Sequence, residues 1–130
     1  APDGPEIRTE SVMQPPEDEV LEILEEVPTE YEYIESDEIL RPMYPEDLTP
    51  GKSHLSKFLI QFWGGPNNYS KERGHPRLRN RHIDFGISRK ERDIWVNHMF
   101  SALESMDIST TDLKIMKSYF EKIATIMINS

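Results

Sequence analysis

The chain has 130 residues, of which 36% are apolar and 9% aromatic, a composition that suits one globular domain with a sizeable core. It contains no cysteine, so disulfides, thiolate catalysis and cysteine-ligated metals are excluded. The apolar runs are far shorter than the ~20 residues of a bilayer span, and no basic-then-apolar signal pattern opens the sequence, so we expect a cytoplasmic protein.

The net charge of -9 is unevenly distributed along the sequence. Residues 1–40 hold fourteen acidic residues against Arg8 alone, which leaves residues 41–130 with a net charge of +4. Residues 71–92 carry eight lysines and arginines against three acids. This basic stretch could bind an anion, or it could be a solvated surface neutralised by the acidic N-terminal part.

The N-terminal third predicts a tail followed by short helices. Residues 1–16 contain four prolines and too few apolar residues to offset the entropy cost of ordering, so we expect them to be disordered. An acidic start and an apolar face predict a helix over residues 17–26, ended by Pro28. Residues 29–40 fit strand and helix spacing equally, and we favour a short helix. Residues 41–45 predict a turn, because proline disfavours helix at the residue before it.

The signals become sharper in the middle of the chain. Thr49 is a candidate cap, Pro50 suits a first helical turn, and the apolar residues that follow recur on one helical face as far as Gly64. Residues 67–76 are polar and are expected to form a loop. Residues 77–83 allow only a short helical segment.

The C-terminal part predicts two longer amphipathic helices. Ser88 with Glu91 three positions later forms a capping box, and an apolar face follows it as far as Met106. Residues 107–110 break this pattern, which then resumes to the C-terminus. We find no convincing strand and no internal repeat, so the sequence predicts an all-α fold.

Histidine is the residue type that could carry metal chemistry here. His54 and His98 lie outside the apolar faces of their helices, so we expect them to be exposed rather than ligating. His75, in a glycine- and proline-flanked loop, could form a loop hydrogen bond. His82 follows three alternating arginines and precedes Phe85, although by spacing alone a structural role is the commoner one for a lone histidine. No metalloprotease, hydrolase or phosphate-loop motif occurs.

Several further motifs occur in a fixed order in the second half of the chain. They are Phe62-Trp63-Gly64-Gly65-Pro66, Tyr69-Ser70, Arg73-Gly74-His75-Pro76-Arg77-Leu78-Arg79, Arg81-His82 and Arg92-Asp93-Ile94-Trp95. With residues 40–48 and the terminal residues 128–130, they resemble the group II (O-type) truncated haemoglobins over about residues 39–130. Each motif alone is weak, but the series is highly specific.

The resemblance implies a truncated globin fold, a two-over-two helical sandwich that holds one haem b in a domain over residues 17–130. His82 matches the position of the proximal ligand, which binds the iron through one imidazole nitrogen while an acceptor holds the other N–H. Arginines pair well with the two haem propionates. The side chains expected to contact the haem are Tyr69, Arg77, Arg79 and Arg81 at the propionates and Leu55, Phe58 and Phe85 as apolar contacts.

On the opposite face of the haem, Gly51 matches the position where many globins place a distal histidine, and it has no side chain to offer. The donors to bound oxygen would then be Trp95, Tyr44 and Tyr31. Trp95 is equally suited to plain core packing, but we favour the donor role, because the outer oxygen of bound dioxygen carries partial negative charge and a buried N–H without a partner is costly.

The first 38 residues depart from the family. Asp18 and Glu19 stand where the family has a glycine pair, and Glu30 replaces the usual phenylalanine beside Tyr31. Pro28 would interrupt the helix that carries this tyrosine. We still expect residues 17–38 to pack onto the haem domain through their apolar side chains, which are Val20, Leu24, Val27, Tyr31 and Ile34.

The resemblance implies a haem protein that binds oxygen, nitric oxide and carbon monoxide, with redox chemistry such as nitric oxide dioxygenase or peroxidase-like activity rather than bulk oxygen transport. It allows an electron-donating reductase as a partner and a homodimer as the assembly. The alternative is a haem-sensing or haem-free interaction module with a degenerate globin pocket. Overall acidity opposes a nucleic-acid partner for the basic stretch, and nothing indicates a membrane partner.

Overall fold

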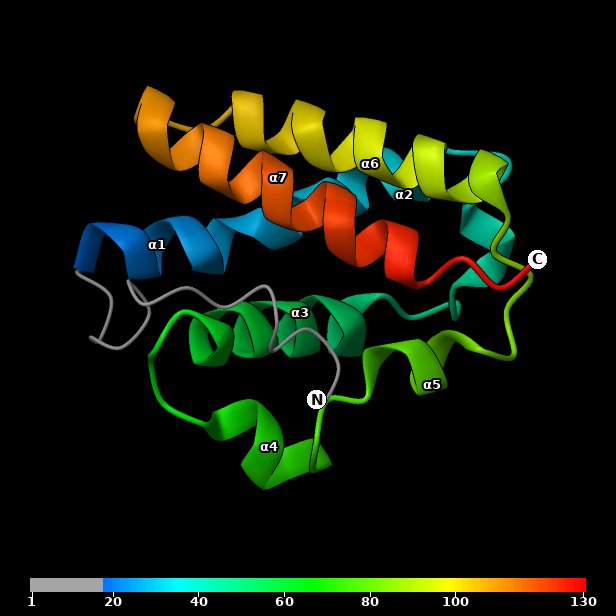
Figure 1. Cartoon of the computed structure of the whole chain (residues 1–130), viewed down its shortest axis with the longest axis horizontal. Coiled ribbons are helices and arrows are strands. Elements are labelled where there is room, and N and C mark those ends of the chain that lie inside the picture. Colours follow the sequence, from blue (N-terminus) through cyan, green and yellow to red (C-terminus); the bar gives the residue numbers. More distant parts are fainter. Residues whose placement is uncertain (1–17) are drawn as a thin grey trace. The chain divides into compact units, whose positions relative to one another are not determined.

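The computed structural model describes residues 18–130, and the regular elements within this range are all helices (Figure 1). The all-α prediction is therefore confirmed for these residues, while the predicted tail over residues 1–16 lies outside them. The described residues fall into two compact units. The first unit contains residues 18–28 and 47–77, and the second contains residues 29–46 and 78–130. None of the described helices is long and apolar enough to cross a membrane.

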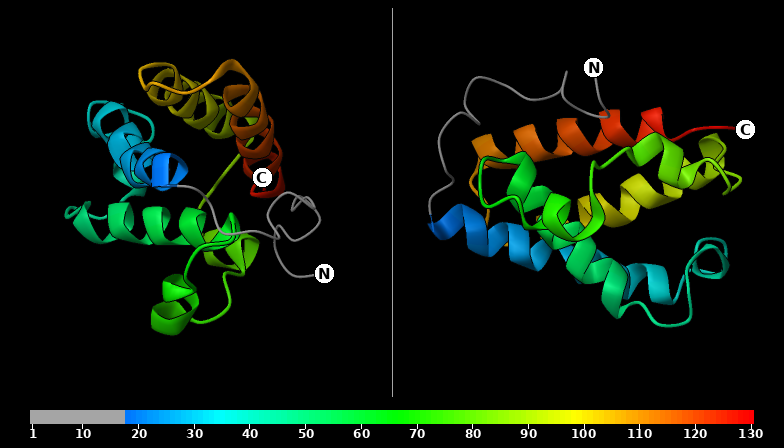
Figure 2. Two further views of the ribbon diagram at one scale, coloured as in Figure 1. Left: turned by 90° about the vertical axis from the view of Figure 1, so that its left-hand side faces the viewer. Right: turned by 90° about the horizontal axis from the view of Figure 1, so that it is seen from below.

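In the first unit, α1 (Asp18–Glu26) packs beside α3 (Thr49–Phe62) (Figure 2). The helix predicted over residues 17–26 is confirmed, and it gives way to the 3-10 turn η3 (Val27–Thr29) at the proline. Leu24 is buried, and its carbonyl accepts a hydrogen bond from the Ser56 hydroxyl at 3.4 Å. Apolar burial and this bond together join α1 to α3.

The start of α3 differs from the prediction. Thr49 is the first helical residue rather than the cap, a position held by Leu48. The acceptor for the free backbone N–H of Thr49 is the Asp47 carboxylate, at 3.0 Å. Pro50 lies in the first turn as predicted. At the other end Gly64, with φ 90°, adopts a left-handed conformation that favours glycine, and so ends the helix.

The loop predicted over residues 67–76 is wrong, because α4 (Asn68–Arg73) forms there. Six residues are too few to hold a helix by propensity alone, so packing must stabilise it. The Gln61 side chain accepts from the Ser70 N–H at 2.9 Å and donates to the Ser70 hydroxyl at 2.7 Å. Tyr69 is buried against Phe58, with ring centroids 5.5 Å apart. These contacts with α3 are invisible in the local polar sequence.

The second unit begins with α2 (Glu30–Glu35) and the 3-10 turn η4 (Arg41–Met43), so both the short helix and the following turn are confirmed. The Arg41 guanidinium donates to the carbonyls of Pro45 and Glu46, each at 2.9 Å, and this fixes the turn. The short helix predicted over residues 77–83 is α5 (Leu78–His82).

Two long helices, α6 (Arg89–Glu104) and α7 (Thr110–Ile126), lie side by side in the second unit, and α2 packs on α6 (Figures 1 and 2). The capping box at Ser88 and Glu91 is confirmed. Ser109 caps α7, because its hydroxyl oxygen accepts from the Asp112 N–H at 3.2 Å. The buried side chains of the two helices include Val96, Met99, Ala102, Leu103, Met116, Phe120 and Ile123.

The acidic segment contributes buried side chains to both units. Leu24 and Val27 are buried in the first unit, and Tyr31 and Ile34 in the second. The side chain of Val20 lies outside the described atoms. The apolar residues expected to pack inward do so wherever they are described, despite Pro28.

Candidate functional site

His82 is the last residue of α5, and its ring is fixed by its own helix. Its Nδ1 lies 2.6 Å from the Leu78 carbonyl oxygen. A carbonyl can only accept, so Nδ1 carries the proton and Nε2 keeps its lone pair. This is the tautomer that a histidine needs when it binds a metal through Nε2. The side chain is half-buried, so the ring is held without being enclosed.

The turn after His82 is tied to the C-terminal end of the chain. The Asn129 side-chain amide donates to the His82 carbonyl at 3.0 Å, and its oxygen accepts from the Ile87 N–H at 3.1 Å. The Asn129 N–H donates back to the Ile87 carbonyl at 2.9 Å. Arg79 adds a bond to the Ile128 carbonyl at 3.3 Å. In the sequence, residues 128–130 contributed only to the family resemblance, and their anchoring role was not predicted.

Two large apolar side chains beside His82 face solvent. Ile83 is 49% exposed and Phe85 is 42% exposed. The Phe85 ring lies 6.4 Å from the His82 ring, at a tilt of 58°. Exposed apolar surface flanking a fixed imidazole suits a flat apolar group bound through its metal.

The donor set also indicates which kind of metal centre fits. Among residues 18–130, no group of three or more histidine, aspartate or glutamate side chains could hold a metal ion. A bare ion therefore lacks a protein cage here. Haem needs only one protein ligand because the porphyrin supplies the other in-plane donors, and His82 can provide that ligand.

Three predicted ligand-side residues lie together in the second unit. The rings of Tyr31 on α2 and Tyr44 after η4 meet edge to face, with centroids 5.7 Å apart. The Trp95 side chain on α6 favours the ionised form of the Tyr44 hydroxyl and so lowers its pKa, an effect smaller than that of burial. The Trp95 ring packs on Phe120, at 6.0 Å. The structure therefore gives Trp95 a packing role, and its role as a hydrogen-bond donor to oxygen stays a prediction.

Both tyrosine hydroxyls are neutral at ordinary pH. Burial, with a smaller contribution from Glu30, raises the pKa of Tyr31 to about 12. Burial also raises the pKa of Tyr44 well above its usual value, with further contributions from Glu30 and Tyr31. Both side chains therefore retain a proton that they can donate.

Glu30 is the functional candidate that the sequence analysis noted only as a departure from the family. It is 1% exposed, and neither carboxyl oxygen has a hydrogen-bond partner among the described residues. Burial raises the pKa of this carboxyl well above its usual value. The sequence signal was an acid beside Tyr31 at a position where the family resemblance implied a phenylalanine.

The first unit holds the predicted haem contacts Leu55, Phe58, Tyr69 and Arg77 and the ligand-side Gly51, whereas Arg79, Arg81 and Phe85 lie in the second unit. Gly51, Leu55 and Phe58 follow the i, i+4, i+7 spacing of one face of α3. Phe58 contacts both Tyr69, as described above, and Phe62, whose ring centroid lies 6.1 Å away. The structure thus brings Phe58 and Tyr69 together in one aromatic cluster.

The prediction that His98 is exposed is wrong. Its Nε2 lies 2.7 Å from Asp37 Oδ2, and its ring stacks on Tyr33 at 5.9 Å. The segment after α2 covers the side of α6 that the helical pattern alone would leave open. The His98 hydrogen bond, and then the bond from the Leu40 N–H, lower the pKa of Asp37.

The remaining histidines take part in local polar contacts. His75 is confirmed as a loop hydrogen-bonding residue, because its Nδ1 accepts from the Arg77 N–H at 3.3 Å. His54 is half-buried rather than exposed, and its Nε2 lies 3.4 Å from an Arg73 guanidinium nitrogen. Neither belongs to a metal-ligand cluster within the described part of the chain.

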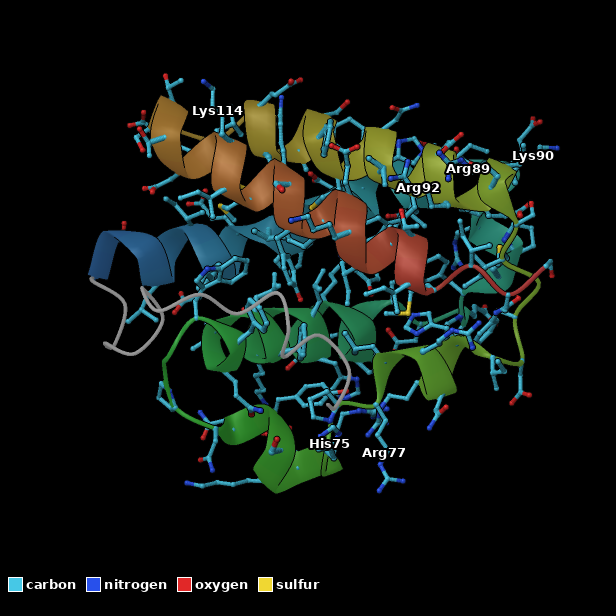
Figure 3. The ribbon with its side chains drawn as sticks, in the orientation of Figure 1. His75, Arg77, Arg89, Lys90, Arg92 and Lys114 are labelled. Carbon is cyan, nitrogen blue, oxygen red and sulfur yellow. The ribbon has the colours of Figure 1, made fainter. Side chains whose placement is uncertain are left out.

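The basic stretch is partly neutralised in the second unit. Arg89, Lys90 and Arg92 lie at the start of α6 (Figure 3), where Arg92 contacts Asp93 at 3.0 Å and Glu121 at 3.8 Å. The side chain of Arg77, in the loop after α4, is exposed, and its φ of 42° is unusual for a residue other than glycine.

Comparison with known proteins places the chain among globins. Residues 18–129 match the family model described as bacterial-like globin. Group 2 truncated hemoglobin YjbI of Bacillus subtilis is 35% identical over 103 residues, which are 79% of this chain and 78% of that protein. The crystal structure of hemoglobin from Chloroflexus aurantiacus has a TM-score of 0.81 and 40% identity, covering 85% of this chain and 92% of that one. The group II truncated hemoglobin from Bacillus anthracis gives 0.81 and 32%, covering 85% of each chain.

Proposed function

Because the chain belongs to the bacterial-like globins, and among them to the group II truncated haemoglobins, we propose that it binds haem b through His82 and takes oxygen, nitric oxide or carbon monoxide at the haem iron. The fold is that of a truncated globin, and family membership supports haem and oxygen binding of the globin type. The iron of bound haem supplies the coordination site for a diatomic ligand.

The observation that carries the proposal is the state of the His82 ring. The Leu78 carbonyl accepts a hydrogen bond from His82 Nδ1–H at 2.6 Å, which orients the ring and leaves Nε2 available as the ligand atom. Ile83 and Phe85 supply apolar surface beside it, and haem would cover that surface.

The charged edge of the haem requires cations and donors. Arg77, Arg79 and Arg81, with Tyr69, are proposed to pair with the propionates. Arg79 already uses one N–H on the Ile128 carbonyl, and a guanidinium has five N–H donors, so it can serve both. Leu55, Phe58 and Phe85 are proposed as apolar contacts of the ring.

On the ligand side, the proposal gives Tyr44 the leading role. In this proposal its hydroxyl oxygen accepts a hydrogen bond from the Trp95 N–H, an arrangement supported by the effect of Trp95 on the Tyr44 pKa, so that the hydroxyl proton can point to a ligand. Tyr31 is a second neutral hydroxyl within the same cluster, and Gly51 leaves space without offering a donor. Trp95 then acts largely by orienting Tyr44.

The cellular role proposed for this site is oxygen binding coupled to redox chemistry, either nitric oxide oxidation or peroxide handling. Both need an electron source, so a reductase is the partner expected to maintain ferrous iron. A cluster of buried neutral hydroxyls near a ligand suits such chemistry, since the hydroxyls stabilise negative charge that develops on bound oxygen.

The experiment that tests the proposal is the absorption spectrum of the purified full chain with one equivalent of haem. We expect a globin-type Soret band and a ferrous deoxy spectrum, with a new spectrum after addition of carbon monoxide. A chain that leaves haem unbound under these conditions would overturn the proposal and support the alternative of a haem-free interaction module.

A further inference from the structure

Glu30 is a buried acid without a counter-charge. Its side chain is 1% exposed, and both carboxyl oxygens lack a hydrogen-bond partner among residues 18–130. A carboxylate in that position would lose its hydration with nothing in exchange, so the folded protein favours the protonated form.

The surroundings of Glu30 are the proposed ligand-side donors. Tyr31 is the next residue on α2, and Tyr44, in edge contact with Tyr31, lies within the electrostatic reach of the Glu30 carboxyl. The side chain of Trp95 affects the pKa of the same Tyr44 hydroxyl. The buried acid therefore lies beside the proposed donors to bound oxygen.

The charged groups His98, Asp37 and Arg41 on the packed segments have partners other than Glu30. His98 on α6 is bonded to Asp37 at 2.7 Å. The Arg41 guanidinium on η4 donates to backbone carbonyls, including those of Pro45 and Glu46 at 2.9 Å. Within the described range, Glu30 forms no ion pair with any of them, so the tyrosine hydroxyls are the groups that its charge would affect.

We propose that Glu30 is a positioning residue of the ligand site. As a neutral acid it leaves the hydroxyl protons of Tyr31 and Tyr44 available to the ligand, and as a carboxylate it attracts those protons to itself. The inference rests on the proposed function, because it concerns the same tyrosine donors and adds a second orientation of their hydroxyl protons, toward Glu30 instead of the ligand. Oxygen would then be held more tightly when Glu30 is neutral and released faster once it ionises.

The direction of the expected change in oxygen release follows from the chemistry of the carboxyl group. A carboxylate only accepts hydrogen bonds, and a bond to a charged acceptor is stronger than one to a neutral ligand. Reorienting one tyrosine hydroxyl removes about one hydrogen bond from the ligand, which corresponds to a roughly threefold to tenfold faster dissociation. Because burial raises the pKa of Glu30, the transition should occur at a pH well above the normal range of a glutamate.

The test measures the carbon monoxide stretching frequency and the oxygen dissociation rate of the haem-bound full chain as a function of pH. The variants are Glu30→Gln, which fixes a neutral side chain of the same shape, and Glu35→Gln, a control at an exposed position of the same helix. We expect one transition in the wild type and in Glu35→Gln. Glu30→Gln should have none, and should keep the low-pH frequency and the slow rate throughout.

A second measurement does not depend on ligand binding. The infrared spectrum of the full chain near neutral pH should contain a protonated-carboxyl C=O band that Glu30→Gln removes and Glu35→Gln keeps. Absence of that band would overturn the proposal, and so would a wild-type transition that persists in Glu30→Gln. If Glu30→Gln folds poorly, Glu30→Phe, which restores the usual family residue, should remove the transition as well. If the chain failed to bind haem at all, a surviving carboxyl band would show that the buried neutral acid is real and that the proposed function is at fault.

Discussion

At the scale of single residues, the chemistry of the site depends on which hydrogen bonds orient His82 and Tyr44. The Leu78 carbonyl accepts a hydrogen bond from His82 Nδ1 and so leaves Nε2 available, and in the proposed function the Trp95 N–H donates to the Tyr44 hydroxyl oxygen and so leaves the hydroxyl proton available. The first hydrogen bond selects which imidazole nitrogen of His82 is available, and the second selects the direction of the Tyr44 hydroxyl proton. The donor that matters for oxygen is therefore expected to be Tyr44.

Replacing the two donors should show this dependence. Tyr44→Phe removes the hydroxyl and should speed oxygen release roughly tenfold, about one hydrogen bond. Trp95→Phe removes the N–H and should speed it by a similar or smaller factor. If Trp95 acts through Tyr44, the double variant should match Tyr44→Phe alone when stopped-flow release is measured. Fully additive effects would show that Trp95 contacts the ligand independently.

At the scale of elements, short segments are held in place by single side chains. α4 depends on Gln61 of α3, and the turn after α2 depends on Asp37, whose carboxylate accepts from the N–H groups of Ile39 and Leu40 and from His98. Such segments contain few residues, so the loss of one of these hydrogen-bonding side chains should destabilise the whole segment.

Removing the Gln61 anchor should loosen α4 selectively. In Gln61→Ala the Ser70 N–H loses its acceptor, and we expect amide hydrogen exchange over residues 70–74 to accelerate at least tenfold, with α6 and α7 unchanged. Lys57→Ala provides the matched control. It breaks a half-exposed ion pair between the same two helices, formed with Glu72 at 2.6 Å, and should change exchange little. Equal effects in the two variants would contradict the assigned role of Gln61.

The Asp37 anchor should make stability depend on pH. Its pKa is lowered below the ordinary 3.8 in the folded state, so the carboxylate contributes stability above that value, and the contribution is lost as pH falls through the folded-state pKa. Asp37→Asn should lower the free energy of unfolding by about 1–2 kcal/mol at pH 7 and by much less near pH 2, as measured by urea denaturation. A cost that stays constant over this range would show that charge is not involved.

The sequence predicted those features whose signals are local. The spacing of Ser88 and Glu91 predicts their capping box, and the glycines after Phe62 predict the end of α3. The structure adds those features that depend on distant partners. α4 needs Gln61, and His98 is covered because the chain after α2 returns to α6. No periodicity in residues 67–76 or around His98 could reveal these contacts.

At the scale of the whole molecule, the acidic N-terminal segment is part of the folded protein from Asp18 onward. It supplies buried residues to both compact units, including Leu24 and Val27 in one and Tyr31 and Ile34 in the other. The family match, which begins at residue 18, covers the same segment. Residues 18–35 therefore form helices of the fold, although several of their residues differ from those that the family resemblance implies.

Two truncations should separate the segment from the tail before it. A chain that begins at Glu17 should retain haem at near the full-length rate, measured by transfer to an apo-globin acceptor. A chain that begins at Ile39 lacks α1 and α2, exposes apolar surface at ~25 cal/mol per Å², and should release haem much faster or fail to fold. Equal retention by both chains would show that residues 17–38 do not support haem binding.

The central claim is that His82 Nε2 is the protein ligand of the haem iron, and replacing the side chain tests it most directly. His82→Gly should lose the globin-type ferrous spectrum, and imidazole added to that variant should restore it by taking the vacated position at the iron. His54→Gly and His75→Gly should keep the wild-type spectrum and should not respond in this way. An unchanged Soret band and ferrous deoxy spectrum in His82→Gly, with loss of both in either control, would contradict the account.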